Sequence, residues 1–136
     1  MSRKKKQGQA KRLIGTRSEA HTYMELPLSV RTLVRGYVQD LGRLRKLSRD
    51  ESVPAGDRKK SAAVVEKIEN AAPDLEPVVM MILLDDIAAI RGFDKSRAHE
   101  MMARPTYYRA KNRLEVGIAS ALGLYHKKLK YDNNSK

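Results

Sequence analysis

The chain has 136 residues, no cysteine and a formal net charge of +12 at pH 7. This length fits one compact domain with tails, and the absence of cysteine excludes disulfides and thiolate metal sites. Residues 1–22 hold seven Lys or Arg and one acidic residue, residues 104–136 hold eight and two, and residues 23–103 hold thirteen of each sign. Each end is therefore +6 around a neutral body, which is typical of a protein that binds nucleic-acid phosphates.

Neither a membrane-spanning nor a secreted protein is indicated. The longest apolar run, Val78 to Leu84, has seven residues, whereas a spanning helix needs about 20. The basic N-terminus is not followed by the apolar region of a signal peptide. We expect a protein of a reducing cytoplasm.

Residues 1–22 are expected to form a disordered basic arm, because few apolar residues are available to anchor them. Its densest cations are Lys4, Lys5 and Lys6. Such an arm either clamps DNA phosphates or only keeps the protein soluble. We assign these three lysines to phosphate contact.

Residues 23–73 are expected to form a helical hairpin. Apolar residues recur at helical spacing over 26–47, which predicts one long amphipathic helix. A linker at 49–56 leads to Asp57, the expected N-cap of a second helix that ends before Pro73. Because two helices cannot cover both apolar stripes, the hairpin should pack on the C-terminal part or on another copy. It is the candidate for self-association or for contact with a polymerase.

The next helix is predicted over 78–91, opened by Glu76 and Pro77 and ended by Gly92. Apolar residues run all around it, which indicates a central buried helix. A buried strand over 78–84 is the alternative, but it would have no partner strand in an otherwise helical chain.

A helix-turn-helix domain is predicted over 74–128. Asp94 or Ser96 can cap a short helix that runs to Met102, and 103–105 form the turn into a longer helix. In such a motif the second helix enters the major groove of DNA.

The last helix is expected to bury one face and present cations on the other. Pro105 is tolerated in its first turn. The apolar positions share one side at a period of 3.6 residues: Tyr107, Leu114, Ile118, Ala121, Leu122 and Tyr125. Arg109, Asn112 and Arg113 fall on the opposite side, where Arg can bind guanine and Asn can bind adenine. A solvated basic face without a ligand is the alternative.

The block Ala103 to Leu114 (ARPTYYRAKNRL), followed by IASALG at 118–123, resembles the recognition helix of sigma-factor region 4-like domains. It is most similar to the ArpU, RinA and LtrC group of bacteriophage late transcriptional regulators. The segment 96–102 is shorter than the first helix of that group, and it lacks the Glu-Ile-Ala pattern and the glycine of the usual turn.

The resemblance implies an activator of phage late genes, acting in the cytoplasm of a bacterial host beside RNA polymerase. It assigns Arg104 and Thr106 to phosphates at the helix entrance and makes Tyr107 a core aromatic residue. Residues assigned to the groove face are Tyr108, Arg109, Asn112 and Arg113, and we add Lys111 to this DNA-binding set.

The C-terminal residues mix aromatics and cations, and 129–136 form a basic tail. We assign Lys127, Lys128 and Lys130 to phosphate contact; stacking on single-stranded bases or a frayed helix end are the alternatives. Three scattered histidines make no local metal site. The adjacent carboxylates Asp85 and Asp86 point about 100° apart on a helix, so pairing with an arginine is expected of them rather than magnesium binding.

The sequence therefore predicts an all-α protein in which an N-terminal helical hairpin packs on a C-terminal helix-turn-helix similar to sigma region 4. We expect a sequence-specific DNA-binding regulator, with no enzymatic activity, cofactor or metal. Its expected partner is double-stranded DNA, and further candidates are RNA polymerase and a second copy of the chain. Two alternatives remain: a phage terminase small subunit, which is a DNA-packaging assembly protein, and an RNA-binding protein.

Overall fold

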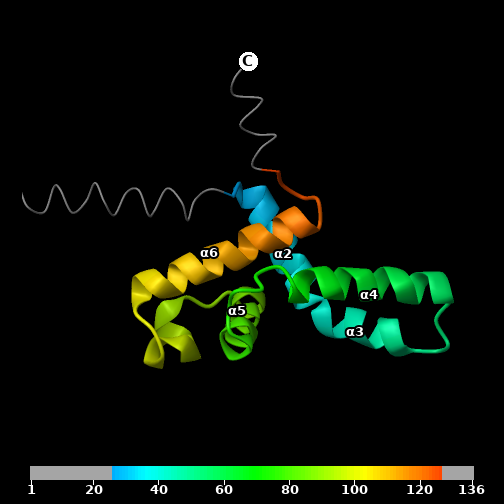
Figure 1. The fold of residues 1–136 in the computed structure, drawn as a ribbon, viewed down its shortest axis with the longest axis horizontal. Coiled ribbons are helices and arrows are strands. Elements are labelled where there is room, and N and C mark those ends of the chain that lie inside the picture. Colours follow the sequence, from blue (N-terminus) through cyan, green and yellow to red (C-terminus); the bar gives the residue numbers. More distant parts are fainter. Residues whose placement is uncertain (1–25, 127–136) are drawn as a thin grey trace, which may run out of the picture.

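The computed structural model describes residues 26–126. Within that range the chain is all-α, as predicted, with five α-helices, two short 3₁₀-helices and no strand (Figure 1). In chain order the elements are α2 (Leu28–Gln39), α3 (Leu41–Arg49), α4 (Ala55–Glu69), α5 (Pro77–Ala89), η1 (Phe93–Lys95), η2 (Arg97–Glu100) and α6 (Arg104–Ala121).

The predicted long helix over 26–47 is divided in two at Asp40. The amide of Asp40 closes α2 on the carbonyl of Gly36 (3.1 Å), and its carbonyl accepts from the Leu44 amide at the start of α3 (2.9 Å). Its carboxylate accepts from Nε and Nη2 of Arg43 (2.7 and 2.6 Å), and these hydrogen bonds lower the pKa of Asp40. Beyond the break α3 bends away from α2 and packs along α4, so α3 and α4 form the hairpin.

The second arm of the hairpin starts earlier than predicted. Pro54 is the N-cap residue of α4, with no side-chain hydrogen bond, so the assignment of Asp57 as N-cap is wrong. Asp57 lies in the first turn instead, with its amide bonded to the Pro54 carbonyl (3.0 Å). A carboxylate there still favours the helix, because it faces the positive end of the helix dipole.

Helix α5 begins as predicted, with Glu76 as N-cap and Pro77 in the first turn, but it ends before Gly92. Ile90 takes the left-handed conformation (φ 58°), and the Arg91 amide closes the helix on the Asp86 carbonyl (2.8 Å). This is the hydrogen-bond pattern of a Schellman C-cap, here with an isoleucine where glycine is usual.

The expectation that α5 is buried all round is also wrong. One side is covered by the rest of the protein, and Leu83 on that side is fully buried. The other side is open, with Val78 50% and Met81 65% exposed.

One hydrophobic core joins the two predicted halves of the body. It contains buried side chains from each of the five α-helices and reaches from Leu26 to Tyr125. Helices α2, α5 and α6 form the body, and the α3–α4 hairpin extends to one side (Figure 1). None of the described helices combines the length and the apolar character needed to cross a membrane.

Candidate nucleic-acid interface

The segment before α6 is not the short α-helix that was predicted. It forms the 3₁₀-helices η1 and η2, separated by Ser96 in an extended conformation (φ −90°, ψ 147°). Ser96 is nevertheless the predicted cap, since its hydroxyl accepts from the Ala98 amide (3.0 Å). Such a short segment gains little from α-helical hydrogen bonds, and 3₁₀ turns are common in connections of this length. The result is a pair of tight turns leading into α6 rather than a regular helix-turn-helix.

Tyr107 anchors the start of α6 in the core, as predicted. Its side chain is fully buried, and its hydroxyl donates to Oδ2 of Asp86 (2.8 Å). The other oxygen of Asp86 accepts from Nε of Arg91 (3.0 Å). Burial, followed by the hydrogen bond to Asp86, raises the pKa of Tyr107 well above its usual value, so the hydroxyl stays protonated as a donor. This chain of bonds sets the rotation of α6 against α5.

An aromatic cluster supports the same turn. The Tyr107 ring packs edge-on against Phe93 (5.5 Å between centroids) and Tyr108 (5.0 Å). The Tyr108 hydroxyl accepts from the Phe93 amide (3.1 Å), and a Cβ at Gly92 would lie 3.0 Å from that oxygen. Tyr108 is therefore half-buried against the loop after α5, and its assignment to the groove face is wrong.

Two more residues of the predicted DNA-binding set, Asn112 and Lys111, are turned inward. Asn112 is only 7% exposed, so it cannot reach a base edge. Lys111 donates to the Arg91 carbonyl (2.8 Å) and lies over the Tyr107 ring (5.7 Å). The buried arc of α6 is wider than the apolar pattern indicated, because α2, α4 and α5 all contact this helix. Ala121, expected to be buried, is exposed at the end of the helix.

The exposed stripe of α6 consists of Thr106, Arg109 and Arg113, which follow one another at spacings of three and four residues. Arg113 binds the carboxylate of Asp74 through Nε (3.0 Å) and Nη2 (2.9 Å). Both side chains of this pair are more than half exposed, and exposed ion pairs contribute little to stability. Arg113 can therefore exchange Asp74 for a phosphate or a base at small cost.

Arg104 is exposed at the entrance of the helix, but it lies on a different side from this stripe, since successive residues of a helix are about 100° apart. Its Nη2 donates to Oδ1 of Asp94 (2.7 Å), and its guanidinium lies over the Phe93 ring (5.0 Å). The structure thus brings three of the seven predicted DNA-binding residues of α6 to one surface: Thr106, Arg109 and Arg113. We call these three residues the α6 stripe.

A polar cluster between α2 and α6 was missed by the sequence reasoning. Glu115 Oε1 lies 4.0 Å from Nε of Arg31, with Arg35 and Lys111 also close enough to act on it. Burial raises the pKa of Glu115, and the three cations oppose that shift. In the sequence, the only sign of this cluster is that Glu115 lies on the same helix as the cations assigned to DNA recognition.

We expect Glu115 to make stability depend on pH. The pKa of Glu115 is higher in the folded than in the unfolded protein. The contribution of Glu115 to the free energy of unfolding is therefore fully present below pH 4.5, the unperturbed pKa, and is lost as the pH rises through the pKa of the folded protein. Urea unfolding of the wild type and of Glu115→Gln from pH 4 to 7 measures this. The variant should gain stability relative to the wild type as the pH rises, and parallel curves would contradict the assignment.

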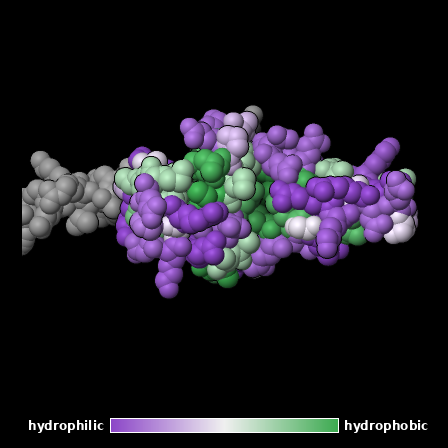
Figure 2. All heavy atoms as spheres, turned by 90° about the horizontal axis from the view of Figure 1, so that it is seen from below, coloured by the Kyte–Doolittle hydropathy of each residue, from purple (hydrophilic) through white to green (hydrophobic). Residues whose placement is uncertain are grey.

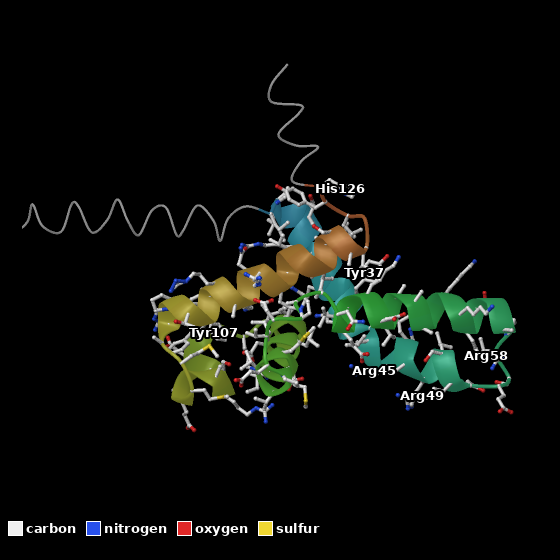
Figure 3. The ribbon with its side chains drawn as sticks, viewed as in Figure 1. Tyr37, Arg45, Arg49, Arg58, Tyr107 and His126 are labelled. Atoms are coloured by element: carbon white, nitrogen blue, oxygen red, sulfur yellow. The ribbon has the colours of Figure 1, made fainter. Side chains whose placement is uncertain are left out.

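A second group of cations lies on the hairpin. Lys46 and Arg49 on α3, and Lys59 and Lys60 on α4, are exposed. Figure 3 labels Arg49 and Arg58 near the far end of the hairpin. Composition did not reveal this group, because residues 40–70 hold eight Lys or Arg and six acidic residues, so their net charge is small.

The two basic ends of the chain continue from described residues on one side of the body. Arg31, in the first turn of α2, approaches Glu115 on α6. The start of α2 and the segment after α6 lie close together on one side of the body (Figure 1), and Figure 3 labels His126 there. The predicted phosphate contacts of the arm and tail lie outside the described residues: Lys4, Lys5, Lys6, Lys127, Lys128 and Lys130.

Asp85 and Asp86 point in different directions, with side chains 64% and 1% exposed, and both contact Arg91. This confirms their expected pairing with an arginine. Within residues 26–126 no group of three or more potential ligands could hold a metal ion. No protein-family model matches the chain, and no curated protein or solved structure shows significant similarity to it.

Proposed function

We propose that this protein binds duplex DNA in a sequence-specific manner through the α6 stripe and acts as a transcriptional regulator. The observation that carries the proposal is the geometry of α6. Its inner face is held by Tyr107 and Asp86, while Arg109 and Arg113 are exposed one turn apart on its outer face. A rigid helix with outward guanidinium groups suits the major groove, where arginine binds O6 and N7 of guanine.

The charge distribution supports DNA as the ligand. The segments 1–22 and 104–136 each carry +6, and phosphate neutralisation supplies most of the sequence-independent affinity for DNA. Since Asn112 is buried, adenine recognition by that residue is not part of the proposal. The preferred site should instead be centred on guanine-containing base pairs, one for each of Arg109 and Arg113.

The experiment that tests the proposal is selection of binding sites from a random duplex library at about 0.15 M salt, which suppresses purely ionic binding. Enrichment of a guanine-containing motif is the expected result. Retention without any motif would overturn sequence specificity and favour the packaging or RNA-binding alternatives. Competition with single-stranded RNA then distinguishes those two.

We expect Arg109→Ala to weaken binding to the selected site by about 1–3 kcal/mol and to relax the preference at one position. The matched control is Arg49→Ala, which removes an exposed cation of the hairpin and should affect specific and random duplex equally or not at all. Titrations of both variants on both duplexes measure this. An equal loss on the two duplexes for Arg109→Ala would contradict base recognition by α6.

The resemblance of 103–123 to phage late regulators extends the proposal to activation of transcription beside a bacterial RNA polymerase. Transcription from a template carrying the selected site, with and without the protein, tests that step. A site-dependent increase in transcript is expected, whereas occupancy without an increase would restrict the function to DNA binding or repression.

A further inference from the structure

The outer face of α5 is uncovered and apolar except for Asp85, an exposed carboxylate one turn after Met81. Val78 is 50% and Met81 65% exposed, and Leu84 and Ala88 beside them are only partly buried. A helix that is apolar all round normally lies inside a protein. In this chain one side of α5 contacts the core, while nothing within the described residues covers the other side.

Two hollows flank this face, with volumes of about 340 and 350 Å³. One lies between α5 and α3 and is bordered by Leu41, Gly42 and Ala88. The other lies beside the connection from α4 to α5, against Pro73 and Leu75. Both are lined by Met81, so this exposed side chain stands between them as a protruding knob. Figure 2, which views the molecule from below, shows hydrophobic surface in the centre with hydrophilic residues around it.

The border of the two hollows carries charges of both signs. Arg45 pairs with Glu69 (2.8 Å) at one side, and Arg97 lies 3.8 Å from Asp85 at the other. These two cations and two carboxylates give the border no net charge, so it offers no net attraction to a nucleic acid or an anionic membrane, whereas such a surface can face a rotated copy of itself without a net repulsion. The border is therefore compatible in charge with a second copy of the same face.

We propose that two copies of this chain associate through the α5 face about a two-fold axis, with Met81 of each copy entering a hollow of the other. A two-fold interface uses the same surface on both subunits and must be self-complementary. The α5 face meets this condition in shape, through a knob between two hollows, and in charge, through its mixed border. Association here would also bury the side of α5 that the monomer leaves exposed.

The dimer goes beyond the proposed function and does not depend on it. If the α6 stripe binds DNA as proposed, the dimer would present two such helices to the two halves of a symmetric site. Self-association is measured without DNA, and site selection is measured separately, so either inference can fail while the other stands.

Sedimentation equilibrium of the full chain, freed of nucleic acid and studied over a range of concentrations, tests the dimer. We expect a reversible monomer–dimer equilibrium. Met81→Glu should raise the dimer dissociation constant at least tenfold, because it would place a carboxylate in the apolar contact. Leu33→Glu is the matched control: Leu33 is 51% exposed on α2 and borders neither hollow, so this change should leave the constant within twofold of the wild type.

A second variant separates weakened association from unfolding. A Cβ at Gly42 would meet nothing within 4 Å, so Gly42→Gln fits the monomer and places its side chain beside the α3–α5 hollow. It should keep or raise the thermal stability of the monomer and still weaken the dimer. A monomer at all concentrations, an oligomer larger than two, or a dimer that both variants leave unchanged would each overturn the proposal.

Discussion

Replacement of Asp86 by alanine should lower the free energy of unfolding by about 3 kcal/mol. The Asp86 side chain is 1% exposed, and its two oxygens accept from the Tyr107 hydroxyl and the Arg91 guanidinium. Its removal leaves the buried hydroxyl of Tyr107 without this partner, and hydrogen bonds to charged groups are among the more costly ones to lose. Urea unfolding at pH 7 measures the change.

The neighbouring carboxylate is the matched control. Asp85 is 64% exposed and lies 3.7 Å from Arg91 and 3.8 Å from Arg97. Because exposed ion pairs of this kind contribute from about 0 to 1 kcal/mol, Asp85→Ala should have a much smaller effect. Equal losses for the two variants would show that the buried bonds of Asp86 do not stabilise the fold.

A double-mutant cycle isolates the bond between Asp86 and Tyr107. Tyr107→Phe removes only the donor, so the combined Asp86→Ala and Tyr107→Phe variant should lose less than the sum of the single losses, by about 1 kcal/mol or more. Strict additivity would mean that the two groups stabilise the protein independently despite their 2.8 Å separation.

Gly117→Ala is expected to destabilise the protein by about 2–3 kcal/mol, at the upper end of the usual cost of overpacking. A Cβ at this position would lie 2.2 Å from the Ala71 carbonyl oxygen and 3.0 Å from its carbon. The obstacle is backbone rather than the end of a flexible side chain, so α6 and the connection after α4 must separate. Chemical denaturation of the variant at pH 7 gives the loss.

The control for this change is Gly36→Ala in α2, where a Cβ would meet nothing within 4 Å. Alanine is favoured over glycine inside a helix by about 0.5–1 kcal/mol, so this variant should gain stability. If Gly117→Ala gained stability as well, the close contact between α6 and Ala71 would be refuted.

Tyr107→Phe and Gly117→Ala also test the proposed function. Tyr107 and Gly117 set the rotation and the depth of α6 against its neighbours, so they decide which side chains remain on the α6 stripe. A variant that stays folded but shifts α6 should lose sequence preference while it keeps its ionic affinity for DNA, since the charges are unchanged.

The helical class, most of the helix positions and the main core side of α6 were predictable from the sequence. Apolar residues at a period of 3.6 determine which side of an isolated helix is buried, and Tyr107, Leu114 and Ile118 are indeed fully buried. The proline positions at the starts of α5 and α6 were predictable for a local reason, because a first-turn proline gives up no helical hydrogen bond. The break at Asp40 was not predictable, since the apolar pattern continues through it.

What the sequence by itself determined was therefore local: an all-α chain, the main buried side of α6, and a basic charge concentrated at the two ends. Tertiary structure decided how far around α6 the burial extends, which turned Asn112 and Lys111 inward. It also decided that α5 is covered on one side only. The physical reason is that the apolar pattern of a helix indicates only which side is buried on average. The number of elements that pack on the helix, and their distance from it, depend on residues distant in sequence, such as Asp86 for Tyr107 and Ala71 for Gly117.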